Sequence, residues 1–375
     1  MEHTTKTITA MKKLLFLSLF AALVAAGCES PENDEHNSPQ NPEEQNPEVP
    51  GDGDEVVEKI PDVLPELPFE YDWVIVAADG TGDYKTLGEA LDKLSGSAAY
   101  HIIHIRPGTY YEKIKVNRRR VILYGDDPET TVLTYDDYAG RPLNSTGTST
   151  VGTQNSASFM VNASDFMAIN VTFSNTHKNM SSSGDQAVAV AVMDDRAAFY
   201  NCRLTGYQDT FYPKNEARVY CKDCYIEGNV DFIFGDAALL CENCTLCANR
   251  NDTPITAPST NPKSPFGFVF RDCRITSLPG KDFRGNDIEK IYLGRAWKEG
   301  ARAVYINCEE PANLSPAGWR DRMSADAVEA LFAEYQCTGE GAAAERLSQR
   351  KNNGRQLTDE EAAEYTRENI FNKDN

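Results

Sequence analysis

The fold is decided by the stretch from Asn201 to Ala248, which reads NCRLTGYQDTFYPKNEARVYCKDCYIEGNVDFIFGDAALLCENCTLCA. It contains one short pattern three times: Asn or Asp, then Cys, then a polar residue, then an apolar one. The second and fourth positions alternate inward, as in a strand with one buried face. The three copies begin at Asn201, Asp223 and Asn243, at intervals of 22 and 20 residues.

Further copies continue the pattern on both sides, at Asn170-Val-Thr-Phe173, Asp272-Cys-Arg-Ile275 and Asn307-Cys308. A repeat near 20 residues with longer excursions is typical of a solenoid, in which each copy forms one coil and each excess a surface loop. No helical pattern separates the copies. We therefore predict an all-β fold, a right-handed single-stranded parallel β-helix.

The repeat also explains the cysteines. Pairs such as Cys221-x-x-Cys224 are typical of zinc sites as well. However, one repeat position is shared by Cys202, Cys224, Cys244, Cys273, Cys308 and Val171, where Cys acts as a small apolar filler. Cys221 and Cys241 correspond to Phe199, Phe270 and Tyr305 of other coils. We expect no metal site, and the sequence leaves open whether neighbouring coils share a disulfide.

The N-terminus has the features of an export signal. Lys12 and Lys13 precede the apolar run from Leu14 to Ala26, and Gly27 and Cys28 follow. The run is too short to span a bilayer as a helix. We predict a signal peptide over residues 1–28 that ends at a lipobox, with Cys28 lipidated; a plain secretory signal is the alternative.

Two further segments follow from composition. Residues 29–66 are rich in Pro, Glu, Asn and Asp and are predicted to be a disordered tether. Residues 67–375 are predicted to be one catalytic domain, which opens with a strand near Trp73. Ser324–Tyr335 and Thr358–Phe371 show helical spacing, and Thr358 and Glu361 fit a capping box, so we expect C-terminal helices packed against the solenoid.

The net charge is −20, but it is unevenly distributed. Fourteen acidic residues and a single Lys lie between Glu29 and Glu70, so the remaining domain is only mildly acidic. A chain without a basic excess is not expected to bind nucleic acid phosphates.

Two aspartates occupy one register in successive coils. Asp209 and Asp231 each lie seven residues after the Cys of their own copy. Stacked parallel strands are about 4.8 Å apart, so we expect the two carboxylates one above the other on the surface. Like charges that close raise the pKa of one group and leave the other ionised, which makes a proton donor and a base or nucleophile. The alternative is a ladder of aspartates that caps turns.

Several neighbours favour the catalytic reading. The amides of Gln186 and Gln208 can donate to a developing oxyanion. Arg295 can hold a carboxylate ionised, and Trp297 offers a flat face to a sugar ring. A solvated Gln and a core Trp are the plain alternatives.

Four blocks in this order resemble the signature blocks of the pectin methylesterase family: Gln186-Ala-Val-Ala-Val190, Gly206-Tyr-Gln-Asp-Thr-Phe-Tyr212, Gly228-Asn-Val-Asp-Phe-Ile-Phe-Gly235 and Tyr292-Leu-Gly-Arg-Ala-Trp297. The similarity extends over roughly Tyr71 to Phe371. It implies hydrolysis of the C6 methyl esters of pectin.

The same resemblance implies the residue roles. Asp231 would be the nucleophile and Asp209 the general acid and base. Gln186 and Gln208 would form the oxyanion hole, and Arg295 would orient Asp231. Trp297, Phe234 and Tyr212 would line the substrate groove. No cofactor or metal is implied, and the expected partner is the polysaccharide.

We further expect an exported monomer, a bacterial lipoprotein of the periplasm or cell surface that touches the membrane only through Cys28. Three rivals remain: another β-helix enzyme on pectin, such as a polygalacturonase or lyase, a non-catalytic glycan-binding lipoprotein, and an esterase or thioesterase for other esters. The loops Arg250–Pro265 and Leu278–Glu289 match the family poorly and are expected to shape the groove.

Overall fold

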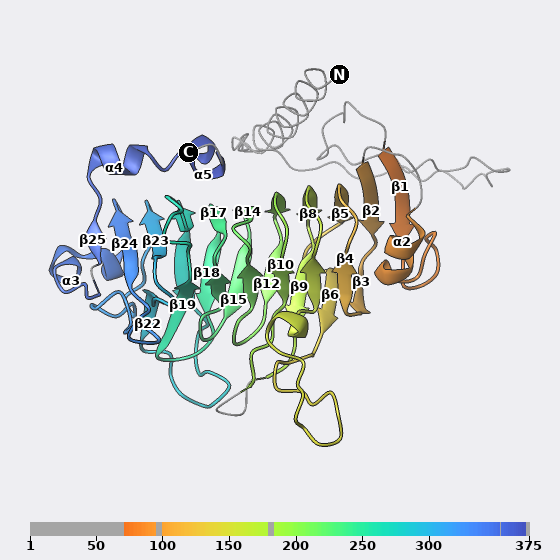
Figure 1. Cartoon of the computed structure of the whole chain (residues 1–375), viewed down its shortest axis with the longest axis horizontal. Coiled ribbons are helices and arrows are strands. Elements are labelled where there is room, and N and C mark those ends of the chain that lie inside the picture. Colours follow the sequence, from red (N-terminus) through yellow and green to blue (C-terminus); the bar gives the residue numbers. More distant parts are fainter. Residues whose placement is uncertain (1–70, 95–99, 179–183, 353, 373–375) are drawn as a thin grey trace, which may run out of the picture. The chain divides into compact units, whose positions relative to one another are not determined.

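A computed structural model describes residues 71–94, 100–178, 184–352 and 354–372, and these form a parallel β-helix, as predicted (Figure 1). Residues 1–70, with Cys28 and the proposed tether, lie outside the described residues. The three parallel sheets of the fold grow along the chain, because successive coils add strands to them.

The first sheet has eleven strands, in the order β1 (Tyr71–Val76), β2 (Tyr100–Ile105), β5 (Val121–Gly125), β8 (Phe166–Ile169), β11 (Ala197–Tyr200), β14 (Arg218–Lys222), β17 (Ala238–Glu242), β20 (Phe268–Arg271), β23 (Ala301–Ile306), β24 (Glu329–Tyr335) and β25 (Arg355–Gln356). The second sheet has seven strands: β4 (Ile114–Val116), β7 (Phe159–Val161), β10 (Val190–Val192), β13 (Phe211–Pro213), β16 (Ile233–Gly235), β19 (Thr253–Pro258) and β22 (Ile291–Gly294). The third sheet also has seven: β3 (Gly108–Tyr111), β6 (Thr131–Tyr135), β9 (Thr172–Asn175), β12 (Arg203–Thr205), β15 (Tyr225–Gly228), β18 (Thr245–Ala248) and β21 (Arg274–Ser277).

The helices are short: α2 (Leu87–Lys93), η1 (Gln154–Ser156), η2 (Glu340–Ala342), α3 (Ala344–Leu347), α4 (Asp359–Ala363) and α5 (Arg367–Phe371). None of the helices in the described ranges is long and apolar enough to cross a membrane.

The first position of the repeat turns the chain from the first sheet into the third. Asn201, Asp223 and Asn243 have φ values of 47°, 55° and 52°. Among residues with a side chain, Asn and Asp adopt this left-handed conformation most readily. Their side chains also form a ladder, in which Asn243 Nδ2 donates to Asp223 Oδ1 at 2.6 Å. The Asn or Asp of each copy is therefore a turn residue.

The second position points into the core. Cys224 and Cys244 are buried, and each Sγ donates to the carbonyl two residues earlier at 3.3 Å. Cys221 pairs in register with Phe199 and with Cys241, as the repeat predicted. The cysteines of the described chain are all free thiols.

One predicted helix was wrong. Within Ser324–Tyr335 the chain forms strand β24, which pairs with β23 in the first sheet. A further copy of the repeat follows, with Gln336 at φ 48° and the Cys337 thiol facing the Tyr305 carbonyl at 3.5 Å. Strand β24 contains Glu, Ala and Leu, which favour helices. Its backbone hydrogen-bonding groups nevertheless pair with the edge of β23, and this tertiary pairing outweighs the helix propensity of the residues.

The predicted C-terminal helices at Thr358–Phe371 are present as α4 and α5. Thr358 caps α4 with Glu361 in a reciprocal capping box, as predicted. The ring of Phe371 in α5 packs edge-on against Tyr220 of β14, and the Phe371 carbonyl accepts a hydrogen bond from Arg218 at 2.9 Å. Helix α5 thus lies against the outer face of the first sheet (Figure 1).

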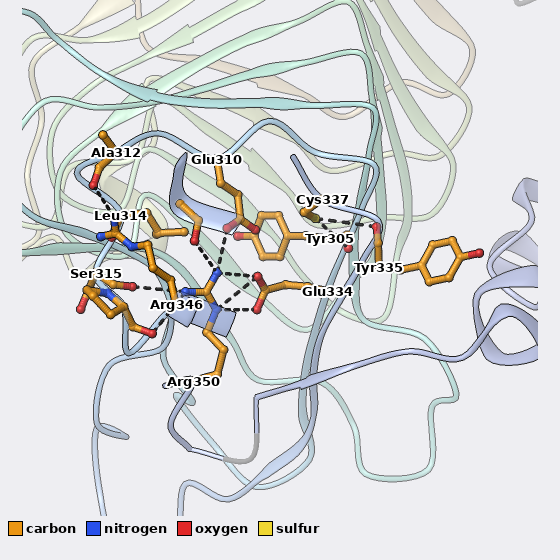
Figure 2. Close-up of polar contacts among 12 residues, drawn as sticks. Tyr305, Glu310, Ala312, Leu314, Ser315, Glu334, Tyr335, Cys337, Arg346 and Arg350 are labelled. Atoms are coloured by element: carbon orange, nitrogen blue, oxygen red, sulfur yellow. Dashed lines mark hydrogen bonds and ion pairs between the residues drawn. The ribbon is translucent and has the colours of Figure 1, made fainter. Parts of the chain in front are cut away.

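A buried cluster of one arginine and two glutamates lies in the last coils (Figure 2). Arg350, which follows α3, donates to Glu310 at 2.8 Å and to Glu334 at 2.7 Å, and the three side chains are at most 1% exposed. Burial and then the charge of Glu334 raise the pKa of Glu310 to about 10. One proton therefore resides on the carboxyl pair, and the cluster carries no uncompensated charge.

Candidate active site

Asp209 and Asp231 lie one coil apart at the start of neighbouring strands of the second sheet. Phe211 of β13 pairs in register with Ile233 of β16. Asp209 lies two residues before Phe211, and Asp231 lies two residues before Ile233. Their φ values are 66° and 55°, so both stand at sharp turns. They are 8% and 4% exposed, which is more buried than the surface position that we predicted. This burial matters because it raises the cost of ionising both groups.

Arg295 binds Asp231 through two parallel hydrogen bonds. The guanidinium Nε donates to Oδ1 at 2.9 Å and Nη2 to Oδ2 at 2.6 Å. Arg295 directly follows β22, and its backbone N–H donates to Thr256 of the intervening strand β19 at 2.9 Å. Such a two-point, charge-assisted contact fixes the orientation of a carboxylate and favours its ionised form.

The two carboxyl groups have different proton affinities. Burial and then the charge of Asp231 raise the pKa of Asp209 well above its ordinary value, and Arg295 and Gln208 oppose this only in part. Burial also raises the pKa of Asp231, but there the hydrogen bonds and charge of Arg295, and then the charge of Arg320, counteract it. Asp209 is therefore the site that retains a proton, and Asp231 is the site that ionises first.

Two glutamines stand beside the pair. The Gln208 side chain hydrogen-bonds Asp209. Gln186 lies one coil earlier, since the N–H of Ala187 donates to the Gln208 carbonyl at 3.0 Å. Both side chains are partly exposed. Two partly exposed amide side chains thus belong to neighbouring coils beside the aspartate pair.

Sequence reasoning missed a residue that holds the Gln186 segment in place. Asn175, at the end of β9, is 1% exposed and donates from Nδ2 to the carbonyls of Val188 and Asp137, at 3.0 Å each. It lies outside the four-residue repeat pattern and in none of the signature blocks, so the sequence alone offered no signal for it.

Three aromatic side chains lie together on the outer side of the second sheet. Tyr212 and Phe234 stack with centroids 4.1 Å apart, and Trp297 lies 5.7 Å from Phe234. Tyr212 and Phe234 are 5% and 3% exposed, whereas Trp297 is partly exposed. The first two therefore form a floor, and Trp297 presents the accessible face.

The structure adds two further neighbours. The charge of Arg320 lowers the pKa of Asp231. The backbone N–H of Arg320 donates to the carbonyl of Gly294, at the end of β22, at 2.9 Å. Phe283, in the loop Leu278–Glu289, packs edge-on against Tyr207 at 5.4 Å, directly before Gln208. This contact brings the loop next to the Gln208 segment. That the loop shapes a substrate groove stays a prediction.

Comparisons with known proteins identify the family. The pectinesterase family model matches residues 73–374. Pectinesterase 31 of Arabidopsis thaliana is 35% identical over 299 residues, which cover 78% of this chain and 90% of that protein. Putative pectinesterase/pectinesterase inhibitor 28 of Arabidopsis thaliana is 36% identical over 72% of this chain, but the match spans only 36% of that protein's length.

Solved structures agree with these relatives. The pectin methylesterase from carrot is 32% identical, with a TM-score of 0.68 over 79% of this chain and 92% of that one. A pectin methylesterase in complex with a hexasaccharide is 28% identical, with a TM-score of 0.65 over 80% of this chain and 96% of that one. Together with the family model, these matches show that the chain belongs to the pectinesterase family.

Proposed function

We propose that this protein hydrolyses the C6 methyl esters of pectin and releases methanol. The observation that carries the proposal is the contact of Arg295 with both oxygens of Asp231, one coil away from the more basic Asp209. In this arrangement Asp231 is a carboxylate held in a fixed orientation, and Asp209 is a proton donor. Ester hydrolysis through a covalent intermediate requires both groups. Relatives named as pectin methylesterases, one of them bound to a hexasaccharide, support the choice of ester.

In the first step an oxygen of Asp231 attacks the ester carbonyl carbon, and the carbonyl oxygen takes up the negative charge. The amides of Gln208 and Gln186 donate to this oxyanion. Collapse of the intermediate breaks the bond to the methoxy oxygen, which takes its proton from Asp209, and methanol leaves. The product of this half-reaction is an anhydride between Asp231 and the sugar carboxyl group.

In the second step Asp209, now ionised, takes a proton from water, and the resulting hydroxide attacks the sugar carbonyl of the anhydride. The bond to Asp231 breaks, the sugar leaves as a carboxylic acid or carboxylate, and Asp209 carries the proton again. Trp297 provides the exposed ring for sugar stacking above the floor formed by Tyr212 and Phe234. Each group is regenerated, so the reaction needs water as its only second substrate.

We also propose that the enzyme works outside the cytoplasm as a monomer anchored through Cys28. This rests on the signal-like residues 12–28, which lie outside the described residues. Mass spectrometry of the N-terminal peptide from the mature protein would test it. A diacylglyceryl group on Cys28 supports anchoring, and an unmodified N-terminus at another residue contradicts it.

The direct test is methanol release from highly methylated pectin by the full chain and its Asp231→Asn variant. The matched control is Asp223→Asn, because Asp223 has the same φ of 55° but occupies a turn position where other coils carry Asn. We expect methanol from the parent and the control and none from Asp231→Asn. A folded parent that releases no methanol would refute the proposed reaction.

A further inference from the structure

The turn that carries Gln208 and Asp209 is held by a side chain from two coils further along the chain. Asn249 directly follows β18 and is 5% exposed. Its Nδ2 donates to the carbonyl of Gly206 at 2.9 Å, although the two residues are 43 positions apart. Strand β15 lies between β12 and β18 in the third sheet, so the Asn249 side chain reaches past one whole coil.

The carbonyl of Gly206 depends on this contact. In the intervening coil, the backbone N–H of Asn229 donates to the Tyr207 carbonyl at 2.8 Å and not to Gly206. No backbone N–H of the residues that the structure describes donates to the Gly206 carbonyl. Because a buried carbonyl without a hydrogen bond is unfavourable, the Asn249 side chain stabilises the position of Gly206.

The surroundings of the Asn249 amide fix its orientation. Its Nδ2 also donates to Glu227 Oε1 at 3.0 Å, and the other oxygen of Glu227 accepts from the Tyr225 hydroxyl at 2.6 Å. Both neighbours of the amide are acceptors, so its NH₂ group must face them. The amide oxygen of Asn249 has no partner among the described residues. The side chain therefore serves as a hydrogen-bond donor.

The turn itself needs to be held. Asp209 has a φ of 66°, a sparsely populated conformation that persists where the surroundings enforce it. Thr210 is fully buried, and its hydroxyl lies 3.2 Å from the Tyr207 carbonyl and 3.0 Å from that of Glu227. Asn249 thus fixes the start of the turn and Thr210 fixes its end.

We propose that Asn249 is a positioning residue for the reaction, which acts through the Gly206 carbonyl to hold Gln208 and Asp209 in their working orientation. This inference rests on the proposed function, in which Gln208 donates to the oxyanion and Asp209 supplies the proton. A shift of the turn would weaken both interactions at once. A misplacement of about 1 Å can lower a rate about 10²-fold, so a contact two coils away has a measurable effect on the chemistry.

The test measures methanol release from highly methylated pectin by the full chain, Asn249→Ala and Asn249→Ser. The matched control is Asn243→Ala, since Asn243 is exposed at the other end of β18 and also donates a side-chain hydrogen bond, to Asp223. We expect Asn249→Ala to lower kcat about 10²-fold with little change in KM. Asn249→Ser retains a donor and should lose less, and the control should keep the parental kcat at temperatures well below its Tm.

The pH profile separates positioning from a merely structural role. The ionisable groups that face Asp209 are Asp231, Arg295 and Tyr212. The hydrogen bond from Gln208 lowers the pKa of Asp209, so a displaced Gln208 lets that pKa rise further. Asp209 acts in its protonated form. The alkaline limb of the kcat profile should therefore move to higher pH in the alanine variant and stay in place in the control.

An unchanged kcat and alkaline limb in Asn249→Ala would overturn the inference while leaving the proposed reaction intact. An equal loss of kcat in Asn243→Ala would also overturn it, because general destabilisation then explains the effect. Should Asn249→Ala not fold, Asn249→Ser is judged by the same criteria.

If the parent releases no methanol from any pectin, the proposed reaction fails instead, and amide hydrogen exchange tests the turn alone. Mass spectrometry then compares the peptide of residues 206–211 in the parent and in Asn249→Ala. Faster exchange of this peptide in the variant, but not in Asn243→Ala, would support the role of Asn249 in holding the turn. Equal exchange in all three proteins would overturn it.

Discussion

Arg295 holds both oxygens of Asp231, at 2.9 and 2.6 Å, although the two residues are 64 positions apart in the sequence. They meet because β22 and β16 are separated in the second sheet only by β19. Among the residues that the structure describes, the neighbouring Asp209 has no comparable ion pair with an arginine. One residue pair therefore decides which of two nearly buried carboxyl groups ionises first.

Replacing Arg295 by Gln should shift the acid limb of the kcat/KM profile to higher pH. Arg295 counteracts the burial that raises the pKa of Asp231, so its loss raises that pKa further, and a more alkaline solution is needed to ionise the nucleophile. Arg295→Lys keeps a charge but not the two-point contact, and should shift the limb less. Initial rates over a pH series measure this, and an unchanged acid limb would contradict the assigned role.

Replacing Asp209 by Asn should reduce kcat by about 10²–10⁴-fold, the usual contribution of a general acid and base. Asp209 is active in its protonated form, and its raised pKa means that activity is lost only as the pH rises through that value. The alkaline limb of the pH profile should disappear in the variant. If kcat falls but the alkaline limb persists, another group supplies the proton.

Replacing Gln208 by Ala should lower kcat about 10²–10³-fold, as for removal of one oxyanion donor, with little change in KM. The interaction is made with charge that develops only in the transition state. Gln356→Ala in β25, at an exposed position, is the control. A rise in KM at constant kcat would instead identify Gln208 as a residue of ground-state binding.

Replacing Glu310 by Gln should stabilise the protein at alkaline pH. Because the folded-state pKa of Glu310 is raised from 4.5 to about 10, its stabilising effect is complete below the ordinary value and is lost as pH rises toward the folded value. Gln imitates the protonated group at every pH, so the variant should show a higher Tm than the parent at alkaline pH and a similar Tm in acid. Thermal unfolding by circular dichroism measures both.

The control for Glu310 is Glu345→Gln, because Glu345 lies exposed in α3. This change should leave the pH dependence of Tm as in the parent. Parallel pH profiles for the parent and Glu310→Gln would show that the buried cluster holds no extra proton.

Replacing Asn243 by Ala should destabilise the fold by about 1–2 kcal/mol, the cost of a left-handed conformation for an ordinary residue. Its φ is 52°, and the change also removes the hydrogen bond to Asp223. Asn243→Gly loses the same hydrogen bond but accepts the conformation, so it should be less destabilising. Denaturant midpoints compare the three proteins, and equal losses for Ala and Gly would assign the whole effect to the hydrogen bond.

The β-helix could be predicted from sequence because its rules are local and recur. Each coil is defined by a short local pattern, without reference to distant parts of the chain. The pattern is a turn residue that tolerates positive φ, then a Cys or Val that points inward, and then a second residue that points inward. The copy at Gln336 escaped notice because Gln replaces Asn or Asp there. The preceding β24 has helix-forming residues, and only its pairing with β23 makes it a strand.

The sequence by itself also determined that Asp209 and Asp231 would stack, because equal spacing from the turn residue carries side chains to equal places in successive coils. Only the tertiary structure decided what each one does. The depth of burial of the two aspartates and the contact of Arg295 with Asp231 depend on how loops and coils of unequal length pack in space. Loop packing follows no period, and the pKa of a carboxyl group depends on charges brought near in space, whatever their distance along the chain.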